Sequence, residues 1–178
     1  MRTISTVIIA GLALFATSCT DKSISNGEIG TYIMGEKAQV GPLIYTVVDS
    51  QWAISLGDPS APRIPGDRFF MVNVSVVNSG KESISVPAFT LVDASGKSYP
   101  ELSNGEGVTN WMGVFRKVGP AETSQGIVLF DVPQREFKMR VADESDLRYA
   151  MIKIPLVLGD PAITKPLDAP AAPRVMKP

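Results

Sequence analysis

Residues 69–78 read Phe-Phe-Met-Val-Asn-Val-Ser-Val-Val-Asn. From Phe70 onward apolar and polar side chains alternate with a period of two, and one face of the segment carries Phe70, Val72, Val74 and Val76. A run of β-branched and aromatic residues with one apolar face is typical of a half-buried strand. This stretch predicts the central strand of the domain. Its polar face, with Asn73 and Ser75, is either open to a partner or covered by another element.

Shorter strand-like segments surround this stretch. They are predicted at residues 36–40, 43–54, 83–92, 123–132, 136–141 and 149–158, with a short strand ending at Tyr99. Residues 58–67 contain three prolines, and they form a loop because proline has no N–H for a ladder. No segment shows a helical period. The sequence therefore predicts an all-β fold, an antiparallel β-sandwich of about seven to eight strands.

Composition excludes several classes of function. The chain has 178 residues, with 17 lysines and arginines against 18 acidic residues, so no strong field of one sign draws it to nucleic acid. Histidine is absent, which removes the commonest general base and metal ligand. The single cysteine can form neither an internal disulfide nor a zinc cluster. We expect no metal and no cofactor.

The amino terminus has the pattern of an export signal. Arg2 precedes an apolar run at residues 7–15, and small residues then lead to Cys19. The run is too short to span a bilayer, which takes about 20 residues. Residues 1–18 resemble the signal peptide and lipobox of bacterial lipoproteins, although Ala16 stands where a larger branched residue is more usual. The alternative is an ordinary signal peptide with a cysteine near its cleavage site.

The lipobox resemblance implies that Cys19 is lipidated and becomes the new amino terminus. Several acyl chains, such as palmitate, hold a protein firmly, because each buried methylene contributes about 0.8 kcal/mol. Thr20 follows the cysteine in place of the aspartate that retains lipoproteins in the inner membrane. In a host with two membranes, the resemblance favours the outer membrane, facing the periplasm. Residues 19–31 are then the lipidated cysteine and a flexible, polar tether.

The carboxyl terminus is rich in proline and alanine. Residues 159–178 contain five prolines, at positions 161, 166, 170, 173 and 178, and proline blocks regular pairing. We predict a disordered tail that is either simply solvated or a spacer or docking peptide for an envelope partner. The folded domain is predicted to cover residues 32–158.

Several local motifs occur together in the folded part. They are residues 32–43 (Tyr-Ile-Met-Gly-Glu-Lys-Ala-Gln-Val-Gly-Pro-Leu), 44–47 (Ile-Tyr-Thr-Val), 76–82 (Val-Val-Asn-Ser-Gly-Lys-Glu), 91–99 (Leu-Val-Asp-Ala-Ser-Gly-Lys-Ser-Tyr) and 126–133 (Gly-Ile-Val-Leu-Phe-Asp-Val-Pro). In this order and spacing they resemble the telokin-like, immunoglobulin-type domain of unknown function found in bacterial lipoproteins and secreted immunoprotective antigens. The resemblance implies an immunoglobulin-like sandwich outside the cytoplasm. It implies no catalytic residues.

The best candidate for a contact surface follows the polar loop at residues 100–110. There the chain reads Trp111-Met112-Gly113-Val114-Phe115. Large apolar side chains on a loop serve as interface anchors, so Trp111, Met112 and Phe115 are candidate partner-binding residues. The alternative is that they cover the open end of the core. Trp52 is expected to be a core or edge residue.

Other candidate sites are weaker. The acidic turn Asp143-Glu144-Ser145-Asp146 offers oxygen ligands for calcium, but it lacks the glycine and spacing of a dedicated loop. A serine nucleophile needs a base, and no spacing selects Ser124 or Ser95 with Lys97. Carboxylate pairs for glycoside hydrolysis would have to come from Asp49, Asp93 or Asp131. Nothing here predicts an enzyme.

The sequence therefore predicts a lipid-anchored protein of the cell envelope that acts as a non-catalytic protein-interaction module. Its partner, an envelope protein, would contact the Trp111 loop or add a strand to an exposed sheet edge. The alternative from a different class is a small-molecule or calcium-binding extracytoplasmic protein. A spacer without specific partners is a third reading.

Overall fold

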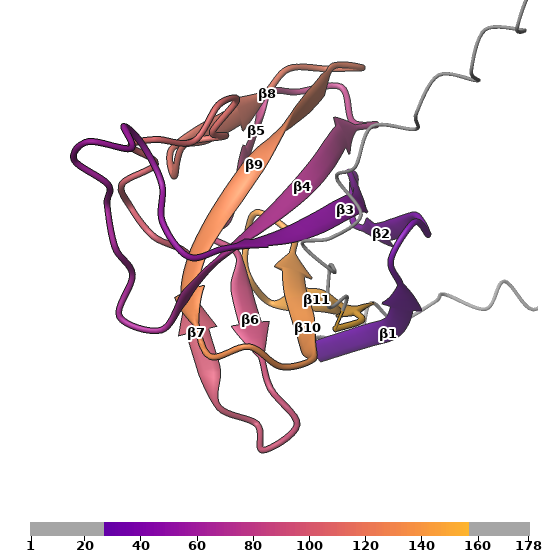
Figure 1. Ribbon diagram of the computed structural model, residues 1–178. Coiled ribbons are helices and arrows are strands. Elements are labelled where there is room, and N and C mark those ends of the chain that lie inside the picture. Colours follow the sequence, from indigo (N-terminus) through magenta and orange to yellow (C-terminus); the bar gives the residue numbers. More distant parts are fainter. Residues whose placement is uncertain (1–26, 157–178) are drawn as a thin grey trace, which may run out of the picture.

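The computed structural model describes residues 27–156. In this range the chain forms eleven strands (Figure 1), and it contains no helix long and apolar enough to cross a membrane. The strands are β1 (Gly27–Ile33), β2 (Ala38–Val40), β3 (Leu43–Ala53), β4 (Arg68–Asn78), β5 (Ile84–Val86), β6 (Thr90–Val92), β7 (Ser98–Pro100), β8 (Arg116–Val118), β9 (Thr123–Val132), β10 (Phe137–Ala142) and β11 (Arg148–Ile154).

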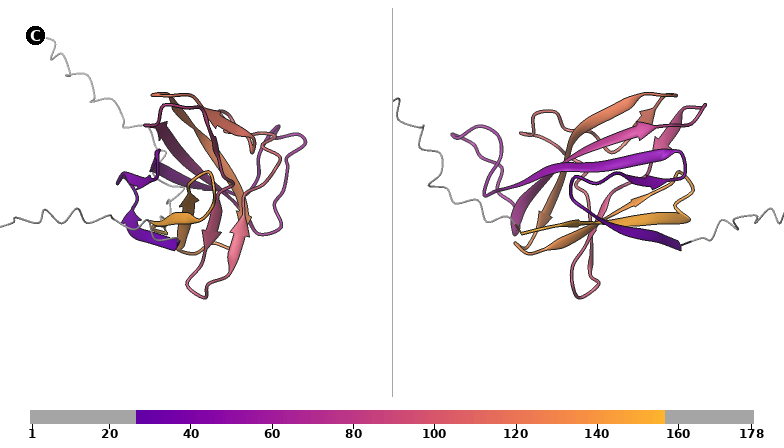
Figure 2. Two further views of the ribbon diagram at one scale, coloured as in Figure 1. Left: turned by 180° about the vertical axis from the view of Figure 1, so that it is seen from behind. Right: turned by 90° about the vertical axis from the view of Figure 1, so that its right-hand side faces the viewer.

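Two sheets pack face to face, as the side view in Figure 2 shows. One has the strand order β1-β11-β10-β6-β7 and the other β2-β3-β4-β9, while β5 and β8 form a small third ladder. All pairs are antiparallel except β1 with β11. The predicted all-β sandwich is confirmed. The strands outnumber the seven to eight expected because β1 and β8 are additional and residues 83–92 divide into β5 and β6.

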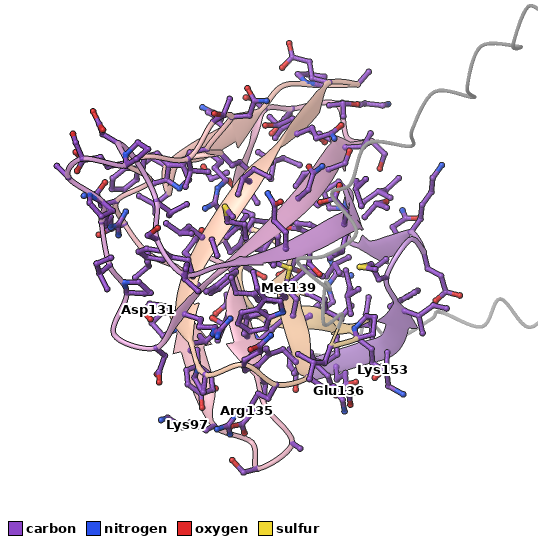
Figure 3. The ribbon with its side chains drawn as sticks, in the orientation of Figure 1. Lys97, Asp131, Arg135, Glu136, Met139 and Lys153 are labelled. Carbon is purple, nitrogen blue, oxygen red and sulfur yellow. The ribbon has the colours of Figure 1, made fainter. Side chains whose placement is uncertain are left out.

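The stretch that predicted the fold is the central part of the four-stranded sheet. β4 pairs with β3 on one side and β9 on the other, along its whole length. The side chains of Phe70, Val72, Val74 and Val76 are at most 1% exposed. They join the main core with residues of the facing sheet, among them Met139, which lies in the middle of the domain (Figure 3).

The other face of β4 is covered along half of its length. Phe69 and Met71 bury their side chains in a second, smaller apolar cluster with Leu56 and Leu129. The loops that follow β3 and β7 supply the cover, since Leu102 and Val108 pack against the same cluster. Farther along the strand, Asn73 and Ser75 stay half-buried. The polar face is therefore part covered and part open.

Hydrogen bonds and aromatic contacts tie the two sheets together. The Tyr45 hydroxyl, on β3, donates to the carbonyl oxygen of Ala142, on β10, over 2.6 Å; burial raises the pKa of Tyr45 far above its usual value. Trp52 stacks on Phe70 with ring centroids 4.2 Å apart, and Phe137 of the facing sheet lies 6.0 Å from Phe70. Trp52 thus packs against the core, as expected.

The folded domain begins earlier in the chain than the sequence predicted, inside the range 19–31 that was expected to be a tether. β1 begins at Gly27, inside the range predicted as flexible, and its residues pair in parallel with Arg148–Lys153 of β11. The segment is short, and glycine and polar residues interrupt its apolar residues Ile29, Tyr32 and Ile33, so no regular hydrophobic period announces it. Its hydrogen-bond partners come from the far end of the domain, which local sequence cannot reveal.

The segment 83–92 was predicted as one strand, and this was wrong. It divides into β5, which pairs with β8, and β6, which pairs with β7 and β10. Pro87 lies between the two pieces and has no N–H to continue a ladder. The chain therefore passes from one ladder to another at this proline. β8 itself was not predicted.

Several predictions fall outside the described residues. These are the signal peptide at 1–18, the lipidation site Cys19 with most of the tether, and the proline-rich tail at 159–178.

Candidate functional site

The three predicted anchors differ in their surroundings. The side chain of Phe115 is 100% exposed, whereas Trp111 and Met112 are half-buried. Met112 packs against the main core. The Trp111 indole nitrogen is buried and has no hydrogen-bond partner among residues 27–156. Of the three, only Phe115 presents a whole apolar side chain to the surroundings.

Trp111 closes the outer edge of the four-stranded sheet. The amide of Ile127, on the terminal strand β9, donates to the carbonyl oxygen of Asn110 over 2.8 Å, and the amide of Met112 donates to that of Ile127 over 2.9 Å. The indole ring lies directly on Gly105, where an added Cβ would come within 2.0 Å of a ring carbon. An exposed strand edge invites pairing with another chain, so this segment protects β9.

Phe115 stands next to a buried ion pair. The guanidinium of Arg116 forms a salt bridge with Glu101, and the two side chains are 2% and 3% exposed. Arg116 also donates from Nε to the carbonyl oxygen of Gly113 over 2.5 Å and lies 4.6 Å from the centre of the Phe89 ring. Gly113, before Phe115, and Arg116, directly after it, are thereby both held by hydrogen bonds.

Glu101 connects this ion pair to the rest of the sandwich. Its second oxygen accepts a hydrogen bond from the amide of Phe89, over 3.1 Å. Burial raises the pKa of Glu101 above its ordinary value, while the hydrogen bond and charge of Arg116 act in the opposite direction. Removing one partner of a buried pair leaves an uncompensated charge and typically costs about 3–5 kcal/mol. The base of the Phe115 loop is therefore rigid.

The carboxylates of the acidic turn already have protein partners. Asp143 accepts from Arg148 Nε over 2.8 Å, Asp146 accepts from Arg140 over 2.6 Å, and Glu144 accepts from the amide of Ser85 over 3.0 Å. In the part of the chain that the structure describes, no cluster of three or more acidic, histidine or cysteine side chains is arranged to hold a metal ion. The turn is built to connect strands.

The remaining carboxylates considered for catalysis are also structural. Asp131 accepts hydrogen bonds from the amides of Gly66 and Asp67 over 2.7 and 2.8 Å, and it lies beside the loop between β3 and β4 (Figure 3). Asp93 organises the turn between β6 and β7, where Ser95 donates to it over 2.6 Å. The Lys97 ammonium lies 4.8 Å from the Tyr99 ring centre.

Sequence reasoning missed the Arg116–Glu101 pair. The two residues lie fifteen positions apart, and neither belongs to a motif. The one signal that could have indicated it is the strand period, which places Arg116 on the same face as Val118; both side chains are buried. A charge at such a position needs a partner, but the pattern does not say which residue supplies it.

Solved structures similar to this chain are bacterial β-sandwiches. The yjhA protein from Bacillus subtilis has a TM-score of 0.53 at 17% identity, with 69% of this chain and 98% of that chain covered. The candidate lipoprotein ycdA from Bacillus subtilis has a TM-score of 0.52 at 16% identity, covering 67% of this chain and 38% of that one. The secreted protein MPT63 from Mycobacterium tuberculosis has a TM-score of 0.51 at 20% identity, covering 71% and 99%. At these identities the likeness shows the fold alone.

Sequence comparison identifies the family. No curated protein matches the chain. Residues 32–150 match the domain of unknown function DUF4352, which spans most of the sandwich and nearly the range of the resemblance drawn from the sequence motifs. The chain therefore belongs to the DUF4352 family, a family of unknown function, and it has an immunoglobulin-like fold.

Proposed function

We propose that this protein is a lipid-anchored, non-catalytic module of the bacterial cell envelope that binds another envelope protein through Phe115. The observation that carries the proposal is the complete exposure of an aromatic side chain next to a fully buried ion pair. Aromatic anchors on rigid supports lose little entropy on binding and are enriched among interface hot spots. In this proposal Trp111 and Met112 support the loop and form the rim of the contact.

The anchor at Cys19 is part of the same proposal. The likeness to a candidate lipoprotein supports it, as does the resemblance of residues 1–19 to a lipobox. Residues 20–26 separate Cys19 from β1, so a lipid on Cys19 would hold the domain close to the membrane surface. We place the domain on the periplasmic side of the outer membrane in hosts that have one. A partner embedded in or attached to the same membrane would be within reach.

Site-specific photocrosslinking in living cells tests the proposal. A benzophenone amino acid replaces Phe115 in one strain and Ile64 in another; Ile64 is a matched control because its side chain is also apolar and 67% exposed. We expect a discrete crosslinked product from position 115 only. The same cells carrying Cys19→Ala should lose both fatty-acid labelling and membrane association, and with them the product.

Two outcomes would contradict this assignment. Identical crosslinked products at positions 115 and 64 would mean that Phe115 is no preferred contact. Retained fatty-acid labelling in the Cys19→Ala variant would exclude the proposed anchor.

A further inference from the structure

A groove of about 620 Å³ lies on the outer face of the four-stranded sheet. Its floor consists of outward-facing side chains on β3, β4 and β9, and residues 107–110 and Leu56 form its walls. This volume falls within the roughly 300–1,000 Å³ of small-molecule sites in proteins. The groove adjoins the second apolar cluster, since Leu56 and Met71 of that cluster also line it.

The walls of the groove are fixed in place. Arg63 donates to the carbonyl oxygens of Asn104 and Glu106 over 2.9 and 3.3 Å, which joins the loop after β3 to the loop after β7. Gly107 touches the backbone of Gly57, where an added Cβ would come within 2.6 Å of the amide nitrogen. The two walls are therefore bonded to each other, and the groove is preformed, which lowers the entropy lost on binding.

A row of amide side chains crosses the floor. Gln125 donates to Asn73 over 3.3 Å, and Asn73 donates to Asp49 over 3.1 Å. Each amide has two N–H donors and an oxygen with two lone pairs, so the row keeps donors and acceptors to spare. Among residues 27–156, the Gln51 side chain makes no hydrogen bond of its own. The floor can therefore both donate and accept.

The lining combines this row with an apolar strip and carries no charge. Val108 and Ile127, which are half-buried, provide the apolar strip. None of the lining residues is acidic or basic. The Asp49 carboxylate at the end of the row is not part of the lining but could pair with a cation. An anionic ligand would lose hydration without gaining a cationic partner in the lining. A ligand with many hydroxyl groups and an apolar C–H face matches both parts, because each hydroxyl donates one hydrogen bond and accepts others.

We infer that this groove is a binding site for an uncharged sugar, a mono- or disaccharide whose hydroxyls contact Gln51, Asn73 and Gln125 and whose C–H face packs on Val108 and Ile127. The inference is independent of the proposed protein contact. Phe115 is not part of the groove lining, so either site can exist without the other.

Titration by NMR tests the site. The ¹⁵N-labelled full chain, in a sugar-free zwitterionic detergent, is titrated with methyl β-glucopyranoside and with N-acetylglucosamine. We expect saturable shifts of the side-chain amides of Gln51, Asn73 and Gln125. Glucuronate, which adds a negative charge to a similar ring, should bind at least about tenfold more weakly.

Matched variants locate the site. Gln51→Ala and Gln125→Ala each remove one polar group and should weaken sugar binding about three- to tenfold. Gln39→Ala, an exposed glutamine on β2 of the same sheet, and Phe115→Ala should bind like the natural protein. Gln51 has no partner to lose, so its variant keeps the fold.

Three results would overturn the inference. One is the absence of saturable shifts with either neutral sugar, and a second is equal affinity for glucuronate. The third is a response to an uncharged peptide, N-acetyl-Ala-Ala-amide, in place of the sugars, which would assign the groove to a peptide.

Discussion

At the scale of single residues, Asp93 shows how one side chain organises a turn. Its oxygens accept hydrogen bonds from the amides of Ser95 and Lys97, the hydroxyls of Ser95 and Tyr99, and the guanidinium of Arg135. The Ser95 hydroxyl is the largest cause of a pKa well below the ordinary 3.8 of this carboxyl. The side chain serves the fold, and the free energy of unfolding should therefore depend on its charge.

The pKa of Asp93 predicts a pH dependence. A folded pKa below the unfolded one means that the stabilisation is fully present above about pH 4 and is lost as the pH falls through the folded value. Asp93→Asn should therefore unfold at a lower temperature than the natural protein at neutral pH. This difference in unfolding temperature should become smaller below about pH 4. Thermal unfolding followed by circular dichroism from pH 7 downward measures it.

Asp58→Asn is the control for this experiment, because Asp58 also caps a turn, through Ser60, but does so with fewer donors. It should change the unfolding temperature less than Asp93→Asn does. If the difference in unfolding temperature between Asp93→Asn and the natural protein stays constant down to the lowest pH measured, the charge of this carboxylate does not stabilise the fold.

At the scale of elements, the segment 102–112 acts as the cover of β9. Leu102 donates to the carbonyl oxygen of Leu129 over 2.7 Å, and the bonds at Asn110 and Met112 continue the cover along the strand. The Trp111 ring on Gly105 holds the two arms of this segment together. Trp111 was predicted from sequence as a contact residue, and its visible role here is the protection of a sheet edge.

Gly105→Ala tests this role. The new methyl group overlaps the Trp111 ring, so the ring has to move, and overpacking of this kind costs typically about 1–3 kcal/mol. We expect a lower free energy of unfolding and faster amide hydrogen exchange at Ile127 and Met112, measured by urea unfolding and NMR.

Gly30→Ala is the matched control, since the nearest atom to its added Cβ would be 3.5 Å away, an ordinary contact. Adding Trp111→Ala to Gly105→Ala should recover part of the loss, because the clash disappears. Unchanged exchange at Ile127 in the Gly105→Ala protein would mean that the ring does not hold the cover in place.

At the scale of the whole molecule, an aromatic group joins the two sheets near one end of the core. Phe137, 3% exposed, lies 6.0 Å from Phe70 and 5.5 Å from Tyr99, measured between ring centres. Figure 3 places the charged side chains of Lys97, Arg135, Glu136 and Lys153 around the same end. The sandwich thus changes there from an aromatic interior to a polar rim.

Phe137→Ala should destabilise the whole domain by about 3–5 kcal/mol, because it leaves a cavity between both sheets. Phe115→Ala removes the same atoms from a fully exposed position and should change the free energy of unfolding by less than about 0.5 kcal/mol. Urea unfolding of both variants measures the contrast. Equal losses would show that Phe115 packs against the domain in solution, which would also weaken its proposed role as an anchor.

Local patterns were sufficient for the β-sandwich and its central strand. The alternation from Phe70 to Val76 places those side chains on one face whatever the rest of the chain does, because successive side chains in a strand point to opposite faces. Turn residues and prolines marked most strand ends for the same local reason. The family resemblance rested on these same motifs, and the match over residues 32–150 confirms it.

Tertiary structure alone decided the features that depend on distant partners. β1 is a strand because β11 offers it hydrogen bonds, Arg116 is buried because Glu101 neutralises it, and the groove exists because Arg63 ties two loops together. Each contact joins segments far apart in the chain and is formed only when the sheets pack. The alternation along a strand shows which side chains point into the core. The residues that they contact in the core are set by the packing of the whole domain.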